Sequence, residues 1–396
     1  MRFASRTAGF ALVAGLAAST WLSAGIDGQR GEQAPPAPPP LEKLTLPSGF
    51  RIQVFAENVR GARSLARGDK GTIFVGSRGA NVHAVVDRNN DGVADDVKVL
   101  ASGLRQPNGV AFRNGALYVA EATRIVRYDG IENTLDAPPP PAVVLDGLPT
   151  RGGSHTWKYL AFGPDGLLYV PVGAPCNICE DPILAEPRFA SIVRLKPDGT
   201  GVEIFAHGIR NTVGFDWHPE TRELWFTDNG RDDMGDDVPE DELNVAPKPG
   251  LHFGYPYCHQ GNVADPMFGA RRPCREFVAP AALMGPHVAA IGMTFYTGMM
   301  FPREYRNAIF IAQHGSWNRS QPIGYRVMVA RVSGQKVTSV EPFVDGFLQG
   351  IRGTPSQNRA TGDAFARPAD VLQLPDGSLL ISDDQQHRIY RVTYGK

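Results

Sequence analysis

Residues 159–173, YLAFGPDGLLYVPVG, contain two short apolar segments separated by a Gly-Pro-Asp-Gly turn. Apolar runs bounded by glycine, proline and aspartate are typical of two antiparallel strands joined by a tight turn. Most copies of this pattern are followed by a third strand that carries Arg or Tyr, such as RIVRYD or SIVRLKPDG. The pattern occurs six times, in copies that begin at Ser64, Gly109, Tyr159, Val213, Met293 and Val371.

A single hairpin of this kind cannot bury both faces, so the copies must stack on one another. Radial stacking leaves only short, protected edges, whereas a two-sheet sandwich accounts poorly for the repeated turn. Residues 50–56, FRIQVFA, form one further strand outside the six copies. We expect this strand to complete the last copy and close the ring. The sequence therefore predicts an all-β protein, a six-bladed β-propeller.

The chain has 396 residues, 42% of them hydrophobic, and a formal net charge of −1. It is long enough to bury a sizeable core, and the near-zero charge gives no electrostatic footprint for nucleic acid. The 44 glycines and 33 prolines favour short strands joined by turns over long helices.

The N-terminus has the pattern of a targeting segment. Arg2 and Arg6 precede an apolar run over residues 8–24, about the length of a secretory signal core and short for a membrane span. We expect a signal peptide at 1–24, with an uncleaved membrane anchor as the alternative. A proline-rich linker at 25–45 and a propeller domain at 46–396 then follow. No later stretch is long and apolar enough to span a bilayer, so the sequence predicts a periplasmic or secreted protein.

In an exported protein, four cysteines are most simply interpreted as two disulfides. Their spacing suggests that Cys176 pairs with Cys179 and that Cys258 pairs with Cys274. A zinc site made by the four cysteines is the alternative. Glu180 follows the Cys-x-x-Cys sequence, so the haem attachment signal is absent.

In a propeller, the loops that lead into the inner strands surround the central axis, so polar residues there converge from distant parts of the chain. A histidine at such a place can act as a general base, and an arginine followed by an asparagine can bind a carboxylate or a developing oxyanion. A lone histidine could instead merely hydrogen-bond its own loop. The residues at these places are Arg63, His155, Arg210, Asn211, His314 and Arg367.

Two segments suggest calcium. Residues 228–244, DNGRDDMGDDVPEDELN, form an oxygen-rich stretch that suits a hard cation, although a solvated acidic loop is equally consistent with it. Residues 87–96, DRNNDGVADD, follow the start of an EF-hand loop, but Lys98 stands where the final Glu belongs. A structural calcium and a plain hairpin both remain open for this second segment, whose possible ligands are Asp87, Asn89, Asp91 and Asp95.

Six motifs, taken in order between residues 46 and 394, resemble the soluble sugar dehydrogenases that use pyrroloquinoline quinone (PQQ), especially the sorbosone dehydrogenases. The motifs are GGSHTWKYLAFGPDG, GIRNTVGFDWHP, TDNGRDDMGDDVPEDELN, FGYPYC, AIFIAQHGSWNR and RPADVLQLPDG. The resemblance implies oxidation of a sugar or sugar aldehyde, with PQQ and Ca²⁺ as cofactors and an external electron acceptor.

The resemblance also assigns roles. It makes His155 the base and Arg210 with Asn211 the contacts of the quinone oxygens. The backbone carbonyls of Gly230 and Arg231 would bind the calcium. Arg63 and Arg367 would pair PQQ carboxylates. His314, which stands where glucose-type members carry a lysine, would be a further PQQ contact. Two alternatives of other classes are a calcium-dependent propeller lactonase and a non-enzymatic propeller that binds a glycan or a protein.

Overall fold

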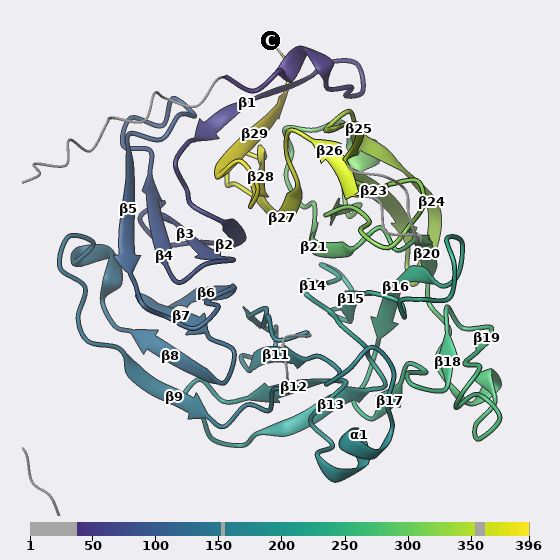
Figure 1. Cartoon of the computed structure of the whole chain (residues 1–396). Coiled ribbons are helices and arrows are strands. Elements are labelled where there is room, and N and C mark those ends of the chain that lie inside the picture. The colour runs from purple at the N-terminus through teal and green to yellow at the C-terminus, as the bar shows by residue number, and fades with distance from the viewer. Residues whose placement is uncertain (1–37, 152–154, 353–360, 396) are drawn as a thin grey trace, which may run out of the picture. The chain divides into compact units, whose positions relative to one another are not determined.

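The computed structural model describes residues 38–151, 155–352 and 361–395 (Figure 1). The predicted signal peptide, residues 1–24, lies outside the described residues, as does most of the predicted linker at 25–45. Residues 40–396 form one compact unit. Within the described ranges, no helix is long and apolar enough to cross a membrane.

The unit is an all-β, six-bladed β-propeller, in which each blade is a sheet of four or five strands (Figure 1). Blades 1 and 2 contain β2 (Ala62–Arg67), β3 (Ile73–Ser77), β4 (Val82–Val86) and β5 (Asp96–Ala101), then β6 (Gly109–Arg113), β7 (Ala116–Ala120), β8 (Arg124–Tyr128) and β9 (Ala142–Asp146). Blade 3 contains β10 (Ala161–Phe162), β11 (Leu168–Val172), β12 (Ser191–Leu195), β13 (Glu203–His207) and β17 (Leu251–His252), the last of which is parallel to β13.

The remaining blades follow the same plan. Blades 4 and 5 contain β14 (Phe215–Trp217), β15 (Leu224–Asp228), β16 (Glu240–Ala246) and β20 (Ala282–Pro286), then β21 (Ala290–Phe295), β22 (Ile309–Gln313), β23 (Arg326–Ser333) and β24 (Lys336–Val344). Blade 6 contains β27 (Pro368–Gln373), β28 (Leu379–Asp383), β29 (Arg388–Tyr394) and β1 (Phe50–Ala56). The predicted six copies are therefore confirmed as six blades.

Short elements decorate the blades. They are the helix α1 (Asp181–Ala185), the hairpins β18 (Cys258–His259) with β19 (Val263–Ala264) and β25 (Leu348–Arg352) with β26 (Thr361–Ala364), and the 3-10 turns η1 (Leu41–Lys43), η2 (Ile131–Asn133), η3 (Cys274–Glu276) and η4 (Arg303–Tyr305).

The ring is closed by β1, which pairs antiparallel with β29 from Phe50 opposite Tyr394 to Val54 opposite Tyr390. This pairing confirms the closure expected from the strand that lay outside the six copies. The ring of Phe50 also packs edge-on against Phe301 and Phe343, at centroid distances of 4.8 and 4.9 Å. The first strand is thus held by both hydrogen bonds and aromatic contacts.

The second strand of each blade explains the apolar pattern of the sequence. Every residue of β3, β7, β11, β15, β22 and β28 is buried. A strand in the middle of a blade has a neighbouring blade on each face, so it is apolar on both faces rather than alternating. The core accordingly lies between blades, as where Trp225 of β15 packs with Met293 of β21 and Ile311 of β22.

Glycines let the inner strands approach each other around the axis. A Cβ added to Gly214, just before β14, would lie 2.2 Å from the carbonyl oxygen of Ile291 in β21. A Cβ added to Gly109 of β6 would lie 2.6 Å from the carbonyl oxygen of Lys158. Any larger residue at either position would force backbone to shift, so the close approach of the inner strands here requires glycine.

The two predicted disulfides are confirmed. Cys176 is bonded to Cys179 in the loop between β11 and α1, and Cys258 of β18 is bonded to Cys274 of η3. No free cysteine remains, so the alternative of a four-cysteine zinc site is wrong.

Candidate active site

A cavity of about 240 Å³ is formed by loops of blades 3, 4 and 5. Its lining residues are His155, Arg210, Asn211, Asn229, Gly230, Asp232, Asp241, His287, Ala289, Trp317 and Asn318. These residues stand before β10, β14 and β21, after β15 and β22, and within β16. Four residues singled out from the sequence, His155, Arg210, Asn211 and Gly230, therefore lie together in one cavity.

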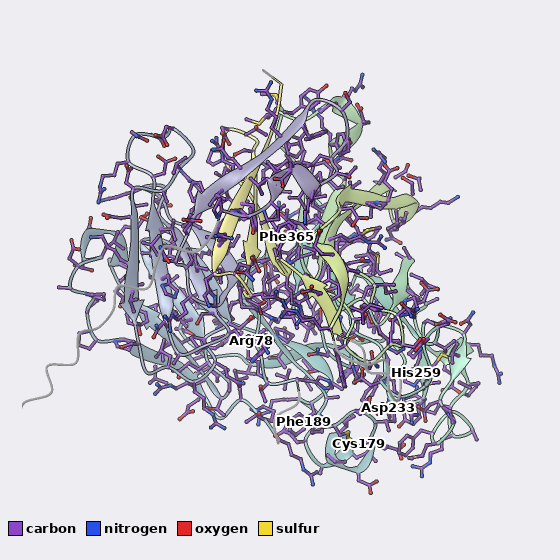
Figure 2. All side chains as sticks on the ribbon, turned by 45° about the horizontal axis from the view of Figure 1, so that its top comes forward. Arg78, Cys179, Phe189, Asp233, His259 and Phe365 are labelled. Atoms are coloured by element: carbon purple, nitrogen blue, oxygen red, sulfur yellow. A yellow bond between two sulfur atoms is a disulfide. The ribbon has the colours of Figure 1, made fainter. Side chains whose placement is uncertain are left out.

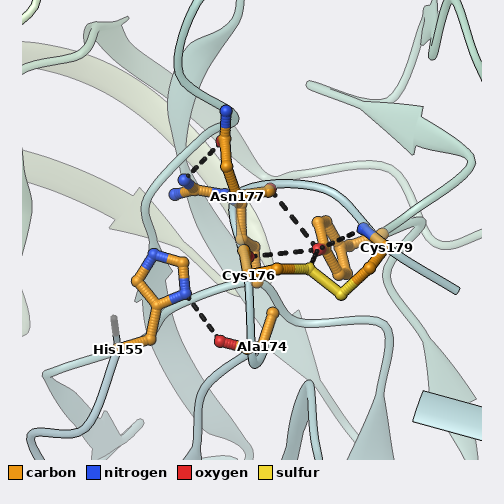
Figure 3. The surroundings of a disulfide bond; sticks show 7 residues. His155, Ala174, Cys176, Asn177 and Cys179 are labelled. Carbon is orange, nitrogen blue, oxygen red and sulfur yellow. Dashed lines mark hydrogen bonds between the residues drawn. A yellow bond between two sulfur atoms is a disulfide. The ribbon is translucent and has the colours of Figure 1, made fainter. Parts of the chain in front are cut away.

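The imidazole of His155 is oriented by the main chain. Its Nδ1 lies 2.8 Å from the carbonyl oxygen of Ala174 (Figure 3). A carbonyl oxygen can only accept, so Nδ1 carries the hydrogen and Nε2 keeps its lone pair for another partner. Burial, and then the charge of Arg210, lower the pKa of His155 to about 3. The ring is therefore neutral near pH 7, and Nε2 is available as a proton acceptor.

The guanidinium of Arg210 is held almost completely by the protein and is only 4% exposed. Nε donates to the carbonyl oxygen of Asn177 at 3.0 Å, and Nη1 donates to that of Asn229 at 3.2 Å. Nη2 donates to Asn177 Oδ1 and to Asp232 Oδ2, both at 2.8 Å. These contacts use four of the five donors of an arginine, which leaves one N–H on Nη1 for a ligand.

Buried aspartates hold the backbone of the loops that enter the inner strands. Oδ2 and Oδ1 of Asp228, at the end of β15, accept hydrogen bonds from the amides of Arg210 and Asn211 at 2.9 and 2.6 Å. Asp383, at the end of β28, accepts one from the amide of Arg367 at 2.9 Å. Burial raises the pKa of both carboxyl groups to about 7. Two of the predicted site arginines are thus positioned by the same device in two blades.

The surroundings of Gly230 are rich in oxygen. The amide of Gly230 donates to Asp241 Oδ1 at 2.9 Å, and burial raises the pKa of Asp241 to about 7. A second cavity of about 10 Å³, the size of one water molecule or ion, has Asp228, Gly230 and Glu242 among its lining residues. Burial, and then the charge of Asp228, raise the pKa of Glu242 to about 8. Arg210 and His259 line this small cavity as well, so its donor set is mixed, and only its carboxylate and backbone oxygens suit a hard cation such as calcium.

Side chains alone do not form a metal centre in the part of the chain that is described, because no three His, Cys, Asp or Glu side chains there are arranged to hold an ion. The calcium expected at Gly230 and Arg231 thus depends on backbone carbonyls and remains a prediction. The side chain of Arg231 forms an ion pair with Asp265 instead of entering the cavity.

The other predicted site residues meet at Asp384. Arg63 Nη1 and His314 Nε2 lie 2.9 Å from its two carboxylate oxygens, Oδ2 and Oδ1. Burial opposes ionisation of Asp384, but His314 and Arg63 together hold its pKa below the usual range. Burial, and then the charge of Arg367, lower the pKa of His314 to about 3. A neutral His314 therefore donates Nε2–H to an ionised Asp384.

Positive charge exceeds negative charge around Asp384. The side chain of Arg63 lies 4.1 Å above the ring of Trp157, and Arg78 Nη1 lies 3.9 Å from Asp384. Arg367 Nε donates to the carbonyl oxygen of His314 at 2.9 Å. Figure 2 labels Arg78, whose side chain is 53% exposed. Three arginines against one carboxylate favour an anionic ligand beside this group.

Lys158 adds a further positive charge near the cavity. Its side chain is fully buried, and burial lowers the pKa of its ammonium group to about 8. The charge of Lys158 also contributes to the low pKa of His155, three residues earlier. Sequence alone does not single out Lys158, because a lysine next to an apolar strand is usually solvated.

The EF-hand-like segment lies in the turn between β4 and β5, away from the cavity of His155. Its side chains bond to amides of the same turn: Asp87 Oδ2 to Gly92 at 2.9 Å, Asn89 Oδ1 to Asp91 at 3.0 Å, Asp91 Oδ1 to Val93 at 2.8 Å and Asp95 Oδ2 to Arg88 at 2.6 Å. Asp87 Oδ1 is buried without a partner among the described residues. Calcium binding by this turn remains a prediction.

Several cavity residues were missed from the sequence. Asn229 and Asp232 lie inside the acidic stretch, and Trp317 and Asn318 lie inside the motif AIFIAQHGSWNR, so each was close to a residue that had been named. His287 had no signal beyond its place before an inner strand. His155 stands at the same kind of place, so the position of His287 in the sequence was itself a usable signal.

Comparison with known proteins gives a family. The sequence model of the TrAA12-like family matches residues 44–395. A protein of Borreliella burgdorferi, described as uncharacterised, is 31% identical over 366 residues, which cover 89% of this chain and 91% of the relative.

Two solved enzymes share the fold. The iodide structure of the Trichoderma reesei carbohydrate-active enzyme of family AA12 has a TM-score of 0.76 at 18% identity and covers 89% of this chain and 98% of its own; the calcium structure of that enzyme has a TM-score of 0.72 at 18% identity, covering 89% and 97%. The holo form of the PQQ domain of pyranose dehydrogenase from Coprinopsis cinerea has a TM-score of 0.73 at 17% identity, covering 88% and 97%.

Proposed function

Since the chain belongs to the TrAA12-like family, we propose that it is a PQQ-dependent oxidoreductase that oxidises a sugar or a sugar aldehyde. The observation that carries the proposal is the neutral imidazole of His155, whose Nε2 is free to accept a proton in the same cavity as Arg210 and Asn211. A neutral imidazole with an unprotonated nitrogen beside a fixed cation is an arrangement that can accept a hydroxyl proton.

The donor set fits PQQ, which carries three carboxylates. Arg63, Arg78 and Arg367 surround a single ionised carboxylate, Asp384, so the group has positive charge left for an anionic ligand. Lys158 lies nearby with no carboxylate within ion-pair distance in the described chain. We assign these basic residues to the carboxylates of the cofactor, and the oxygen-rich side of the cavity around Gly230 to Ca²⁺.

PQQ, when bound, would supply a quinone that accepts the hydride of the substrate carbon, that is, two electrons together with the C–H hydrogen. Nε2 of His155 accepts the proton of the substrate hydroxyl or aldehyde hydrate, while the carbonyl of Ala174 keeps the ring in the required tautomer. The remaining N–H of Arg210 Nη1 is available to donate to the developing negative charge, and the contacts with Asn177 and Asp232 fix the position of the guanidinium beforehand.

Three finer points belong to this proposal. The motifs favour sorbosone-like aldehydes among the substrates. An external electron acceptor reoxidises the cofactor. Two disulfides support a periplasmic or secreted location, because such bonds persist in oxidising compartments.

The alternatives have less support. A calcium-dependent lactonase needs side-chain carboxylates that converge on one ion. In the described part of the chain, the buried carboxylates Asp228 and Asp383 instead bond backbone amides, and no three acidic, His or Cys side chains are arranged to hold an ion. A purely binding propeller has no use for a histidine held in one tautomer beside a fixed arginine.

The test is reconstitution of the purified protein with PQQ and Ca²⁺, followed by reduction of an artificial dye with aldoses and sugar aldehydes. Lactone hydrolysis is assayed in parallel. We expect dye reduction that requires both PQQ and a sugar substrate. Lactone hydrolysis without PQQ, or sugar binding without any dye reduction, would instead support one of the alternatives.

A further inference from the structure

Asn318 lies in the loop between β22 and β23 and lines the same cavity as His155. It is only 4% exposed, and its Oδ1 is buried without a hydrogen-bond donor among the described residues. The adjoining Trp317 lines the cavity as well, yet it is 46% exposed. A buried acceptor and an accessible aromatic side chain thus stand next to each other at the candidate site.

The orientation of the Asn318 amide is determined by its neighbours. Nδ2 lies 3.0 Å from Asp232 Oδ1, and a carboxylate can only accept, so the nitrogen must face Asp232. Nδ2 also lies 3.4 Å from Nδ1 of His287. Nε2 of His287 donates to the carbonyl oxygen of Gly235 at 2.9 Å, which leaves Nδ1 as an acceptor. Both contacts require the same orientation of the amide, in which Oδ1 has no hydrogen-bond donor among the described residues.

The same network connects Asn318 to the reacting centre. Asp232 accepts from Asn318 through Oδ1 and from Arg210 through Oδ2. The amide is therefore fixed relative to the guanidinium by one shared carboxylate. An acceptor that is buried, fixed and unsatisfied is stabilised by a ligand that brings a donor to it.

We propose that Asn318 Oδ1 accepts a hydrogen bond from a sugar hydroxyl other than the one that is oxidised, and that the indole of Trp317 packs on the sugar ring. Asn318 is then a specificity-determining residue that selects polyhydroxylated substrates over simple alcohols and aldehydes. The inference rests on the proposed function. Its physical basis is that a site built to bond a hydroxyl discriminates strongly against an analogue that lacks it.

The experiment compares a good aldose substrate with its series of monodeoxy analogues in the PQQ-loaded enzyme. We expect one analogue to lose roughly tenfold in kcat/KM with the wild-type protein, as loss of a hydroxyl contact to a neutral amide predicts. In Asn318→Ala, that analogue and its parent react equally, because the acceptor is gone. Trp317→Ala weakens binding of all the sugars alike. Asn133→Ala is the control for an asparagine outside the cavity and leaves the discrimination unchanged.

Two measurements distinguish failure of this inference from failure of the proposed function. If every deoxy sugar reacts with the wild type as well as its parent does, the inference is overturned even if Asn318→Ala fails to fold. If Asn318→Ala weakens PQQ binding in a direct titration and leaves the deoxy penalty intact, the donor belongs to the cofactor and the inference is overturned. Neither result affects the proposed function, which fails only if no sugar is oxidised in the presence of PQQ.

Discussion

Asn177 holds Arg210 with two of its oxygens: Oδ1 accepts from Nη2 at 2.8 Å, and the backbone carbonyl accepts from Nε at 3.0 Å. Asn177 stands inside the four-residue ring closed by Cys176 and Cys179. The disulfide therefore lies directly behind a guanidinium of the candidate site. The loop at residues 176–179 therefore positions Arg210, in addition to the local cross-link that its disulfide provides.

Substitution of Asn177 should affect turnover although the residue does not line the cavity. Asn177→Ala removes the bond to Arg210 and the bond from the amide of Asp232 to Oδ1 at 2.9 Å. We expect kcat/KM to fall by roughly tenfold, equivalent to about 1.4 kcal/mol. Asn177→Asp keeps an acceptor for Arg210 and should recover most of the loss in dye-linked assays. Equal activity of the alanine variant and the wild type would contradict this positioning role.

The two disulfides should differ in what they contribute. The bond between Cys258 and Cys274 spans a sequence separation of 16, and that between Cys176 and Cys179 spans 3. From loop entropy alone, removal of the longer one costs about 3 kcal/mol of stability and removal of the shorter one about 2 kcal/mol. Because only the shorter one supports Arg210, we expect its double serine variant to lose more activity. Denaturant titration measures the loss of stability in both variants, and dye-linked turnover measures the loss of activity. We expect the longer disulfide to matter more for stability and the shorter one to matter more for activity.

Substitution of His155 should reduce turnover without weakening the binding of PQQ. His155→Ala is expected to retain PQQ, since the basic residues remain, and to lose turnover by roughly 10²–10⁴-fold. Because the pKa of His155 is lowered to about 3, its titration should produce no acid limb in kcat/KM between pH 5 and 8. His207→Ala, in β13 and outside the cavity lining, is the matched control. Wild-type turnover of His155→Ala at saturating PQQ would falsify the assignment.

Stability should fall as the pH rises through neutrality. In the unfolded chain, Asp228, Asp241 and Glu242 ionise near pH 4, whereas burial raises their folded pKa values to about 7, 7 and 8. The folded state thus binds more protons between pH 4 and 8, and that stabilisation is lost as the pH rises through the folded pKa values. His155 acts in the opposite direction, but only below about pH 6.5, where the unfolded histidine becomes protonated.

We therefore expect the Tm to be lower at pH 8 than at pH 6.5 and the drop to be smaller in Asp228→Asn. If calcium binds beside Gly230, it should raise the Tm more at pH 8, where the carboxylates are ionised, and a chelator should reverse the gain. A Tm that rises between pH 6.5 and 8 in calcium-free buffer would show that these carboxyl groups are ionised in the folded protein.

The fold was predictable because its signals are local. Each blade repeats an apolar pair of strands around a turn, and the strand at 50–56 had no partner until the ring was closed. His155 and Arg210 were found for the same reason, since each precedes an inner strand. Asp384 could not be found in this way, because its partners His314 and Arg63 lie 70 and 321 residues away. Nor does sequence show that Asn318 has one oxygen without a partner, because this follows from the placement of Asp232 and His287.

The pairing of Phe50 with Tyr394 means that this ring has a seam, where the blade is assembled from both ends of the polypeptide. The chain ends could instead lie at the border between two other blades. A circular permutant that joins residue 394 to residue 50 by a short linker and opens the chain at exposed Gly103, between β5 and β6, would keep every strand pair while moving the break to another blade border. In the natural order, β1 is synthesised first and waits for β29, so the ring cannot close until the last strand has been made.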